Sequence, residues 1–561
     1  MSEIIRKWQM LWLVCMLVPM AGFGSNAVWD GSTDTGFQNV NATWGVDDQW
    51  SYNGVDLFSF KSTDAAFFGG NGSVSASPSG NFTVTVSGTQ TCVAVRQLQN
   101  GAGDFTLEGG TIITGAGGAR ADRGTFTVNS VLDGSTTTFQ LNAPASGAVL
   151  VLGGSNTFDG VAQIRGSSGG TILLNNPGAL GDNYTQFYNT GVTLDLNGLD
   201  ISGKDMTVNA GQTGFLGNSG DSESTWAGNL TLATGASNIR AGGTDSAVEF
   251  AGVISGDGGV QVMDGGILRL SGANVHTGNT VVRPGGTLII NNAAALGTTD
   301  SITYIQDAST LDLNGFNVGS EEINMQKAYS RLVNEAVGAA TVGGPVSLSA
   351  GGLEIGGSGD LTLSGAISGA GWFTKVGTGT LSFSATNPYV GPTSVNEGTL
   401  VGGSGAFSGS TKVSVAGGAG LVLQDVAVCN TSVMLSLDDT AALDLDYSGT
   451  QVITGLSLDG GTNWLAEGVY DAAQLSSINA SGAYTGTGSL EVFVPDTLEI
   501  NEGSLVLNWI GEYGASYTVE STTNLVSGAW VPVASNLVGV GQWLNYTGAV
   551  SDAAEFYRII K

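Results

Sequence analysis

The stretch LSGANVHTGNTVVRPGGTLIINNAAALG (residues 270–297) alternates short apolar runs with Gly, Asn and Pro, and it holds the only histidine of the chain, His276. Two further stretches follow the same pattern, around Asn156 and Asn387, in register with Asn274. In each copy a ring follows the Asn by two residues and a Gly by four; the rings are Phe158, His276 and Tyr389. His276 therefore occupies an aromatic position of a repeat, which predicts a structural role and not a ligand role.

The repeat extends over a longer period. TLDLNG occurs at 193–198 and again at 310–315, a separation of 117 residues. NNPGALG at 175–181 matches NNAAALG at 291–297, a separation of 116 residues. The agreement of the two offsets indicates a long repeat of about 115 residues.

Each long repeat contains runs of four to six residues that alternate apolar and polar positions, which is typical of strands with one buried face. Gly and Asn separate the runs every 8–12 residues, and either a sandwich array or a solenoid could accommodate them. The spacing of the Asn-ring-Gly units favours coils of roughly 20–25 residues. We therefore predict an all-β fold, with a right-handed parallel β-solenoid (β-helix) over residues 28–495. The segment 321–338 is ambiguous, and it could be a helical turn or a strand pair.

Composition excludes several classes of protein. The 90 Gly lack a period of three and there are only 10 Pro, so the chain is not collagen-like. There are 47 acidic and 17 basic residues, giving a net charge of −30, which repels nucleic acid and anionic lipid. We expect no nucleic-acid partner.

The N-terminus predicts export. Arg6 and Lys7 precede an apolar run at 10–20, and Ser-Asn-Ala ends at Ala27. This pattern is typical of a secretory signal peptide over residues 1–27, too short to span a bilayer, and no longer apolar run follows. We expect a secreted, extracellular or cell-surface protein with no transmembrane segment in the mature chain. The two remaining cysteines, Cys92 and Cys429, are expected to be lone buried thiols.

Residues 496–561 contain fewer Gly and more aromatic residues, and they predict a small C-terminal β-sandwich. Five strands are expected, near 504–509, 516–521, 529–533, 542–547 and 555–560. Three aromatic side chains could stack on a sugar ring, although a small sandwich also needs such residues in its core. These candidates are Trp530, Trp543 and Tyr546.

The search for chemistry identifies no catalytic, cofactor or metal site. Asp195 and Asp312 lie in the two TLDLNG copies, where we expect the leucines to point inward and the carboxylates to face water. Asp444 and Asp446 alternate with apolar residues and are expected on one solvent face. We predict no enzymatic activity and no cofactor.

The sequences at 270–292 and 381–401 resemble the autotransporter-associated β-strand repeat, a Leu-x-Gly-x-Asn-x-Tyr-x-Gly-x-Thr run. The Trp-Asp-Gly opening at 29–31 and the segment 447–475 resemble the start and the closing segment of such repeat regions. The 66 residues after 495 are fewer than the membrane barrel of an autotransporter needs, so the resemblance is expected to concern the passenger. The ending Phe-Tyr-Arg-Ile at 556–559 is similar to that of terminal modules in secreted proteins of the Planctomycetes–Verrucomicrobia group.

The resemblance implies a structural or adhesive rod associated with the cell surface, with a C-terminal module for anchoring or recognition. The alternative is a polysaccharide-binding or polysaccharide-degrading β-helix protein. Polysaccharide or a cell-envelope surface is the expected partner, and the pattern leaves the oligomeric state open.

Overall fold

A computed structural model describes most of the chain. The described residues are 26–29, 42–45, 50–51, 62, 64–68, 81–97, 104–134, 137–166, 169–189, 191–235, 237–243, 246–349, 351–493, 497–501, 504–510, 515–525, 529–538, 543–549 and 556–561. The chain divides into two compact units, Met1–Gly278 (unit 1) and Asn279–Lys561 (unit 2), and each is considered by itself. The predicted signal peptide lies outside the described residues, apart from Asn26 and Ala27.

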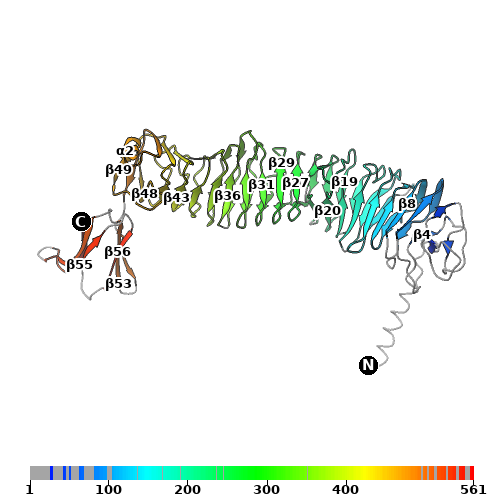
Figure 1. Cartoon of the computed structure of the whole chain (residues 1–561), viewed down its shortest axis with the longest axis horizontal. Coiled ribbons are helices and arrows are strands. Elements are labelled where there is room, and N and C mark those ends of the chain that lie inside the picture. The colour runs from blue at the N-terminus through cyan, green and yellow to red at the C-terminus, as the bar shows by residue number, and fades with distance from the viewer. Residues whose placement is uncertain are drawn as a thin grey trace, which may run out of the picture. The chain divides into compact units, whose positions relative to one another are not determined.

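One face of unit 1 is a sheet in which strands from successive coils pair in parallel (Figure 1). Gln140 pairs with Gln163, and Gln163 pairs with Gln186, so each of these coils takes 23 residues (163 − 140 and 186 − 163). This pairing confirms the predicted parallel β-solenoid and the predicted coil length. Strands of this sheet include β4 (Ala65–Phe68), β7 (Val95–Gln97), β10 (Ala119–Ala121), β13 (Thr138–Asn142), β15 (Val161–Arg165), β17 (Thr185–Phe187), β19 (Met206–Val208), β22 (Leu230–Leu232) and β25 (Ile254–Gly256).

A second sheet of unit 1 places identical or similar apolar side chains above one another. Leu150, Ile172, Leu194 and Leu216 pair in turn along it, and all four side chains are fully buried. Burying each such side chain contributes about 1.5–3 kcal/mol, so the stacked rows form the core of the coils. Strands of this sheet include β5 (Phe82–Val86), β8 (Phe105–Glu108), β11 (Thr125–Val128), β14 (Val149–Leu152), β16 (Gly170–Leu174), β18 (Val192–Asp195), β20 (Thr213–Gly217), β23 (Asn238–Ala241) and β26 (Gly259–Val262).

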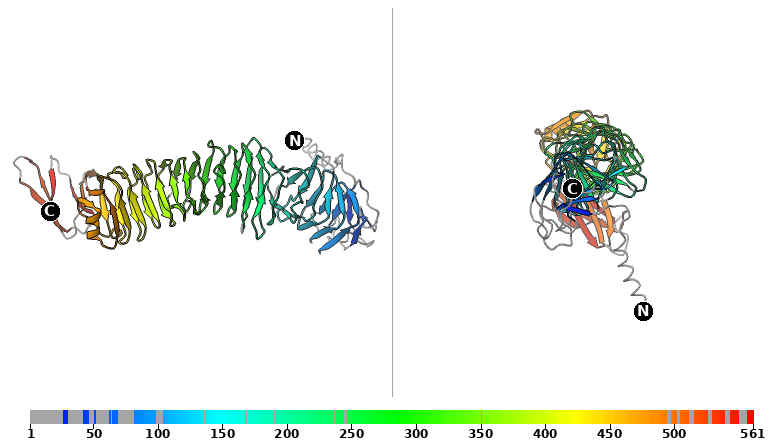
Figure 2. Two further views of the ribbon diagram at one scale, coloured as in Figure 1. Left: turned by 90° about the horizontal axis from the view of Figure 1, so that it is seen from above. Right: turned by 90° about the vertical axis from the view of Figure 1, so that its right-hand side faces the viewer.

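Unit 2 is also built of stacked coils (Figure 2). These coils take 20–23 residues in the register Leu311–Leu332–Ile355 and Leu353–Phe373. One face contains β28 (Thr280–Val282), β30 (Ile302–Ile305), β32 (Glu322–Met325), β35 (Val346–Leu348) and β38 (Ile367–Ser368). A second face contains β29 (Thr287–Ile290), β31 (Thr310–Asp312), β33 (Arg331–Val333), β36 (Leu353–Gly356), β39 (Phe373–Val376), β41 (Thr393–Val395), β43 (Lys412–Val415), β45 (Met434–Leu437) and β48 (Gly455–Ser457). A third contains β34 (Ala340–Val342), β37 (Leu361–Leu363), β40 (Thr380–Phe383), β42 (Thr399–Gly402), β44 (Gly420–Leu423), β46 (Ala442–Leu445) and β50 (Ala483–Gly486).

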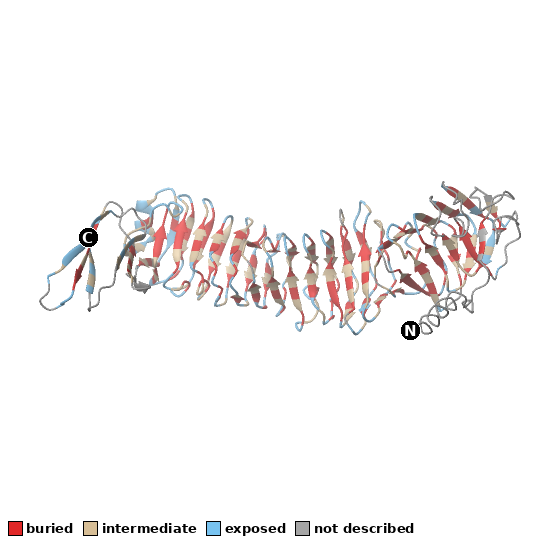
Figure 3. Cartoon of the chain, turned by 90° about the horizontal axis from the view of Figure 1, so that it is seen from below, coloured by how far each residue is buried: buried red, intermediate tan, exposed pale blue. Residues whose placement is uncertain are grey.

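The ambiguous segment 321–338 contains the two strands β32 and β33 and no helical turn. The two strands lie in different sheets and pair with neighbouring coils, not with each other. Burial follows the coils throughout, with buried residues along the strands and exposed residues at the corners (Figure 3). Cys92 and Cys429 are both buried and both free, as predicted.

The first strands of unit 1 depart from the parallel pattern. Strand β1 (Asn26–Trp29) pairs in parallel with β4 and antiparallel with β3 (Trp50–Ser51). Trp29, Trp50 and Phe68 are fully buried and pack ring against ring, with Trp29 and Trp50 centroids 5.2 Å apart and Trp50 and Phe68 centroids 5.7 Å apart. These aromatic rings therefore cap the core of the first coil, whose apolar interior would otherwise be exposed to water.

Near the last coils of unit 2, β49 (Gly468–Asp471) pairs antiparallel with β51 (Ser489–Val492), which also pairs with β47 (Thr450–Ile453). Between these strands lies helix α2 (Ala472–Ile478), which the sequence analysis missed. The side chain of Asp471 accepts a hydrogen bond from the Gln474 N–H, and the Gln474 side chain accepts one from the Asp471 N–H. This capping box starts the helix. Among the described residues, no helix has the length and apolarity needed to cross a membrane.

The C-terminal residues form two three-stranded antiparallel sheets that pack on a shared core, as expected for a β-sandwich. The core contains Leu505, Leu507, Trp509, Tyr517 and Val519. The five expected strands are present with a sixth before them. The strands are β52 (Thr497–Asn501), β53 (Ser504–Ile510), β54 (Ser516–Thr522), β55 (Val531–Val538), β56 (Trp543–Ala549) and β57 (Phe556–Ile560). The domain boundary at 495 stays a prediction.

Candidate functional site

The asparagine of the repeat joins three coils. The Oδ1 atom of Asn387 accepts a hydrogen bond from the Ile367 N–H (2.9 Å), and its Nδ2 donates to the Ala406 carbonyl (3.2 Å). Asn156 makes the same two kinds of contact, and Asn274 accepts the equivalent backbone bond. All three side chains are buried. The polar residue that defines the repeat is therefore engaged in holding successive coils together.

The ring position beside each Asn is also structural. Phe158, His276 and Tyr389 are all fully buried. The Tyr389 hydroxyl lies 2.5 Å from the Thr393 Oγ1 atom. Burial lowers the pKa of His276 to about 4, so the imidazole is neutral in the folded protein at neutral pH. The interpretation of His276 as a substitute for an aromatic residue agrees with this placement.

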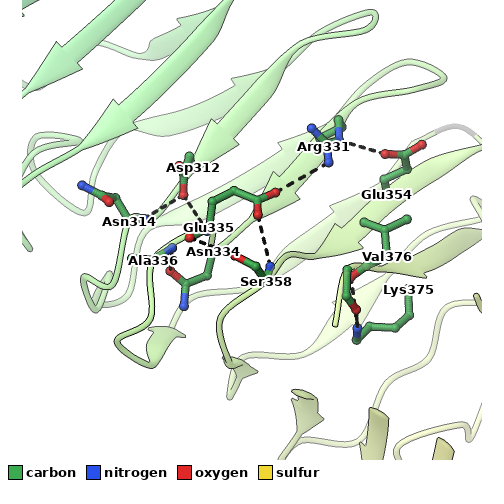
Figure 4. A network of polar contacts seen from close by, with 11 residues as sticks. Asp312, Asn314, Arg331, Asn334, Glu335, Ala336, Glu354, Ser358, Lys375 and Val376 are labelled. Atoms are coloured by element: carbon green, nitrogen blue, oxygen red, sulfur yellow. Dashed lines mark hydrogen bonds and ion pairs between the residues drawn. The ribbon is translucent and has the colours of Figure 1, made fainter. Parts of the chain in front are cut away.

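The two TLDLNG aspartates lie at equivalent coil corners. The Oδ1 atom of Asp195 accepts hydrogen bonds from the N–H groups of Asn197 (2.9 Å) and Ser219 (3.0 Å), and Asp195 is only 8% exposed. The expectation that Asp195 faces water is therefore wrong, because the corner turns its carboxylate onto backbone donors of its own turn and of the next coil. Asp312 makes the same bonds, to Asn314 (2.9 Å) and to the next coil (Figure 4).

Charged side chains extend this corner network across the coils of unit 2 (Figure 4). The Arg331 guanidinium lies 2.8 Å from the Glu354 carboxylate and 3.8 Å from that of Glu335. The Glu335 Oε2 atom in turn accepts the Ser358 N–H (3.1 Å). These side chains are about one third to one half exposed, so each pair contributes only about 0–1 kcal/mol.

Two lysines are buried against backbone carbonyls. Lys375 is fully buried, and its Nζ donates to the carbonyls of Val376 (3.0 Å), Gly377 (2.6 Å) and Glu397 (3.0 Å). Burial lowers the pKa of Lys375 to about 8. Lys204 bonds two carbonyls of the preceding coil in the same way. Each ammonium group satisfies carbonyl groups at a corner, which is a structural use of a cation.

The remaining acidic candidates do not gather into a metal site. Asp444 and Asp446 lie on the outward face of one strand end, Asp444 half-buried and Asp446 exposed, as expected. Across the described ranges, no group of three or more His, Cys, Asp or Glu residues could hold a metal ion.

Of the three aromatic candidates of the C-terminal module, the structure describes the side chains of Trp530 and Tyr546. The Arg558 guanidinium lies 4.3 Å from the centroid of the Trp530 ring and also pairs with a carboxylate. Tyr546 packs against the core of the sandwich, 6.4 Å from the ring of Tyr557. Trp543 begins β56, and its side chain lies outside the described residues. Sugar stacking by these residues stays a prediction.

Sequence reasoning missed a row of arginines on the outer face of unit 1. Arg96 pairs in register with Arg120, Arg120 with Asn142, and Asn142 with Arg165. We name Arg96, Arg120 and Arg165 the arginine row. Their separations of 24 (120 − 96) and 45 (165 − 120) residues are one and two coils, a signal that becomes visible only when the coil length is known.

Two segments of the solenoid, 264–290 and 373–401, match the family described as Passenger-associated-transport-repeat. The chain is 27% identical over 333 residues to "Adhesin BmaC autotransporter" of Brucella suis biovar 1 (strain 1330). That alignment covers 56% of this chain and 9% of the adhesin, so the chain spans a small part of that protein's length. No solved structure matches the chain. The protein is a β-solenoid similar to autotransporter passengers, with a distant adhesin relative.

Proposed function

We propose that the chain is a secreted, cell-surface-associated β-solenoid with a structural or adhesive role and no catalysis. Its C-terminal module anchors it or recognises a surface. The observation that carries this proposal is that the residues defining the repeat, such as Asn387 and Tyr389, build the coils themselves. The similarity to passenger repeats and to an adhesin supports a surface location and an adhesive role.

The engagement of the reactive side chains supports a non-catalytic role. A polysaccharide hydrolase needs paired carboxylates, and a lyase needs a base that can reach the substrate. The Asp195 and Asp312 carboxylates accept backbone N–H groups at corners, and the Lys375 ammonium donates to three carbonyls. These groups stabilise the coils.

The test measures adhesion and turnover together. Beads carrying the purified full chain are placed under flow over surfaces coated with cell-envelope material or polysaccharide, and released reducing and unsaturated sugars are assayed in the same samples. We expect bead retention above that of albumin-coated beads and no sugar release. Sugar release that scales with protein concentration would contradict the proposal. Protease treatment of intact cells that express the chain tests its surface exposure.

A further inference from the structure

The outer face of the sheet that contains β7, β10, β13, β15 and β17 differs in charge from the rest of the chain. The chain has 47 acidic and 17 basic residues, yet these five strands contain no Asp or Glu and carry the three arginines of the row. Neighbouring strands lie about 4.8 Å apart, so the arginines are spaced one and two coils apart along the stacking direction. This arrangement is a strip of positive charge.

Asp122, the carboxylate that pairs with two arginines of the row, leaves positive charge available on the strip. The Asp122 side chain is fully buried, and its two oxygens lie 2.9 Å from the Arg96 guanidinium and 2.6 Å from that of Arg120. The two arginine side chains are still 34% and 32% exposed. One buried negative charge thus orients two positive groups that face solvent, so the pair keeps a net positive charge.

Arg165 completes the strip, and no carboxylate among the described residues forms an ion pair with it. Its Nε and one terminal nitrogen donate to the Gln163 Oε1 atom (3.0 and 2.6 Å), and its guanidinium lies 3.8 Å from the centroid of the Tyr188 ring. Tyr188 is 42% exposed, and Tyr184 on the same coil is 38% exposed. The amide of Gln163 bonds that of Gln186 on the next coil (2.8 Å), which continues a polar ladder beside the arginines.

The guanidinium groups and the Tyr188 ring match the parts of an acidic sugar polymer. A guanidinium binds a carboxylate or sulfate through two parallel hydrogen bonds, and a tyrosine ring covers the apolar face of a pyranose. The buried Gln163 amide positions the Arg165 guanidinium. Exposed Asp159, Asp182 and Asp205 precede β15, β17 and β19, at the strand ends away from Arg165 and Tyr188. These carboxylates flank the strip and repel the second phosphate backbone of a nucleic-acid duplex, which disfavours duplex DNA.

We propose that the arginine row, with Tyr188, binds an anionic polysaccharide laid along the stacking direction of the coils. The inference rests on the proposed adhesive function and names its ligand class. Charge complementarity selects the partner, since this strip is positive within a chain of net charge −30.

The test compares the full-length chain with single variants on immobilised polygalacturonate, heparin, neutral dextran and duplex DNA at several salt concentrations. We expect the wild type to bind the two acidic polysaccharides more tightly than dextran or DNA, with affinity falling as salt rises. Arg165→Gln removes one charge-assisted contact and is expected to weaken binding on the order of tenfold. Tyr188→Leu removes the ring, and we expect it to weaken binding as well.

Arg269→Gln is the matched control. Arg269 lies on β27 (Ile267–Leu270) and pairs with Glu223 (3.0 Å), so this variant removes the same charge outside the row. An equal loss in Arg269→Gln and Arg165→Gln would overturn the proposal, as would tighter binding to DNA or an absence of binding to both acidic polysaccharides. Circular dichroism verifies folding, and Tyr188→Leu provides the readout if Arg165→Gln does not fold. The bead assay separates this inference from the adhesive function. If beads carrying the wild type and beads carrying Arg165→Gln are retained equally on surfaces free of acidic polysaccharide, this inference is overturned and the adhesive function stands.

Discussion

Replacing Asn387 by alanine tests whether the repeat asparagine holds the coils together. Asn387 is fully buried, and its side chain satisfies the N–H of Ile367 and the carbonyl of Ala406. Asn387→Ala leaves both backbone groups buried without this partner. Each such group costs about 1–3 kcal/mol, so we expect a loss of about 2–5 kcal/mol after partial relaxation.

The loss is expected to be local. Each coil of a solenoid contacts only its neighbours, so the destabilisation falls on the coils that contain Ile367, Asn387 and Ala406. Native-state hydrogen exchange measures this directly. A factor of ten corresponds to about 1.4 kcal/mol, so the Ile367 amide is expected to exchange roughly 30-fold to several thousand-fold faster.

Asn396→Ala is the matched control, because Asn396 is exposed and lies less than one coil after Asn387 along the chain. We expect it to change local stability by less than about 0.5 kcal/mol. If the Ile367 amide exchanges at the same rate in Asn387→Ala and in Asn396→Ala, the asparagine contacts do not stabilise the coils and the reasoning fails.

Three further variants test buried groups. Burial raises the pKa of Glu321 to about 7, so the stability that its protonated form provides is complete below its usual pKa of 4.5 and is lost as pH rises through 7. Glu321→Gln should remove this loss, on the order of 3 kcal/mol, when unfolding by urea is measured across this pH range. Equal slopes of unfolding free energy against pH in both proteins would refute this. Burial lowers the pKa of His276 to about 4, so the stability that its neutral form provides is present above pH 6.5 and is lost as pH falls toward 4. Between these pH values, the melting temperature of His276→Phe should fall less than that of the wild type. An equal fall in both proteins would contradict a buried, neutral His276. A Cβ on Gly391 would lie 2.1 Å from the Gly371 carbonyl oxygen, so Gly391→Ala should lower the free energy of unfolding by several kcal/mol. Gly319 has open space around it, so Gly319→Ala should leave stability nearly unchanged. Similar melting temperatures for the two variants would show that neighbouring coils move apart easily at Gly391.

Sequence reasoning was accurate where local pattern sufficed. The burial of His276 followed from Phe158 and Tyr389 at the same repeat position, and the coil length followed from the spacing of these units. The prediction that the Asp195 carboxylate faces water was wrong. Alternation along a strand carries no information about the backbone N–H groups that a corner and the next coil offer to a side chain. Helix α2 was missed since seven residues carry too little helical periodicity, although Asp471 and Gln474 form a recognisable capping box.

The sequence by itself indicated the parallel β-solenoid, because alternating apolar residues, Gly corners and repeated Asn-ring-Gly units recur at intervals that favour stacked coils over a sandwich array. The tertiary structure alone decided which outward side chains meet. Arg96, Arg120 and Arg165 are separate residues in the sequence, and the ladder register places them in one row with Tyr188. The physical reason is that a one-residue shift in register would turn every side chain to the opposite face, and that register is set by packing between coils.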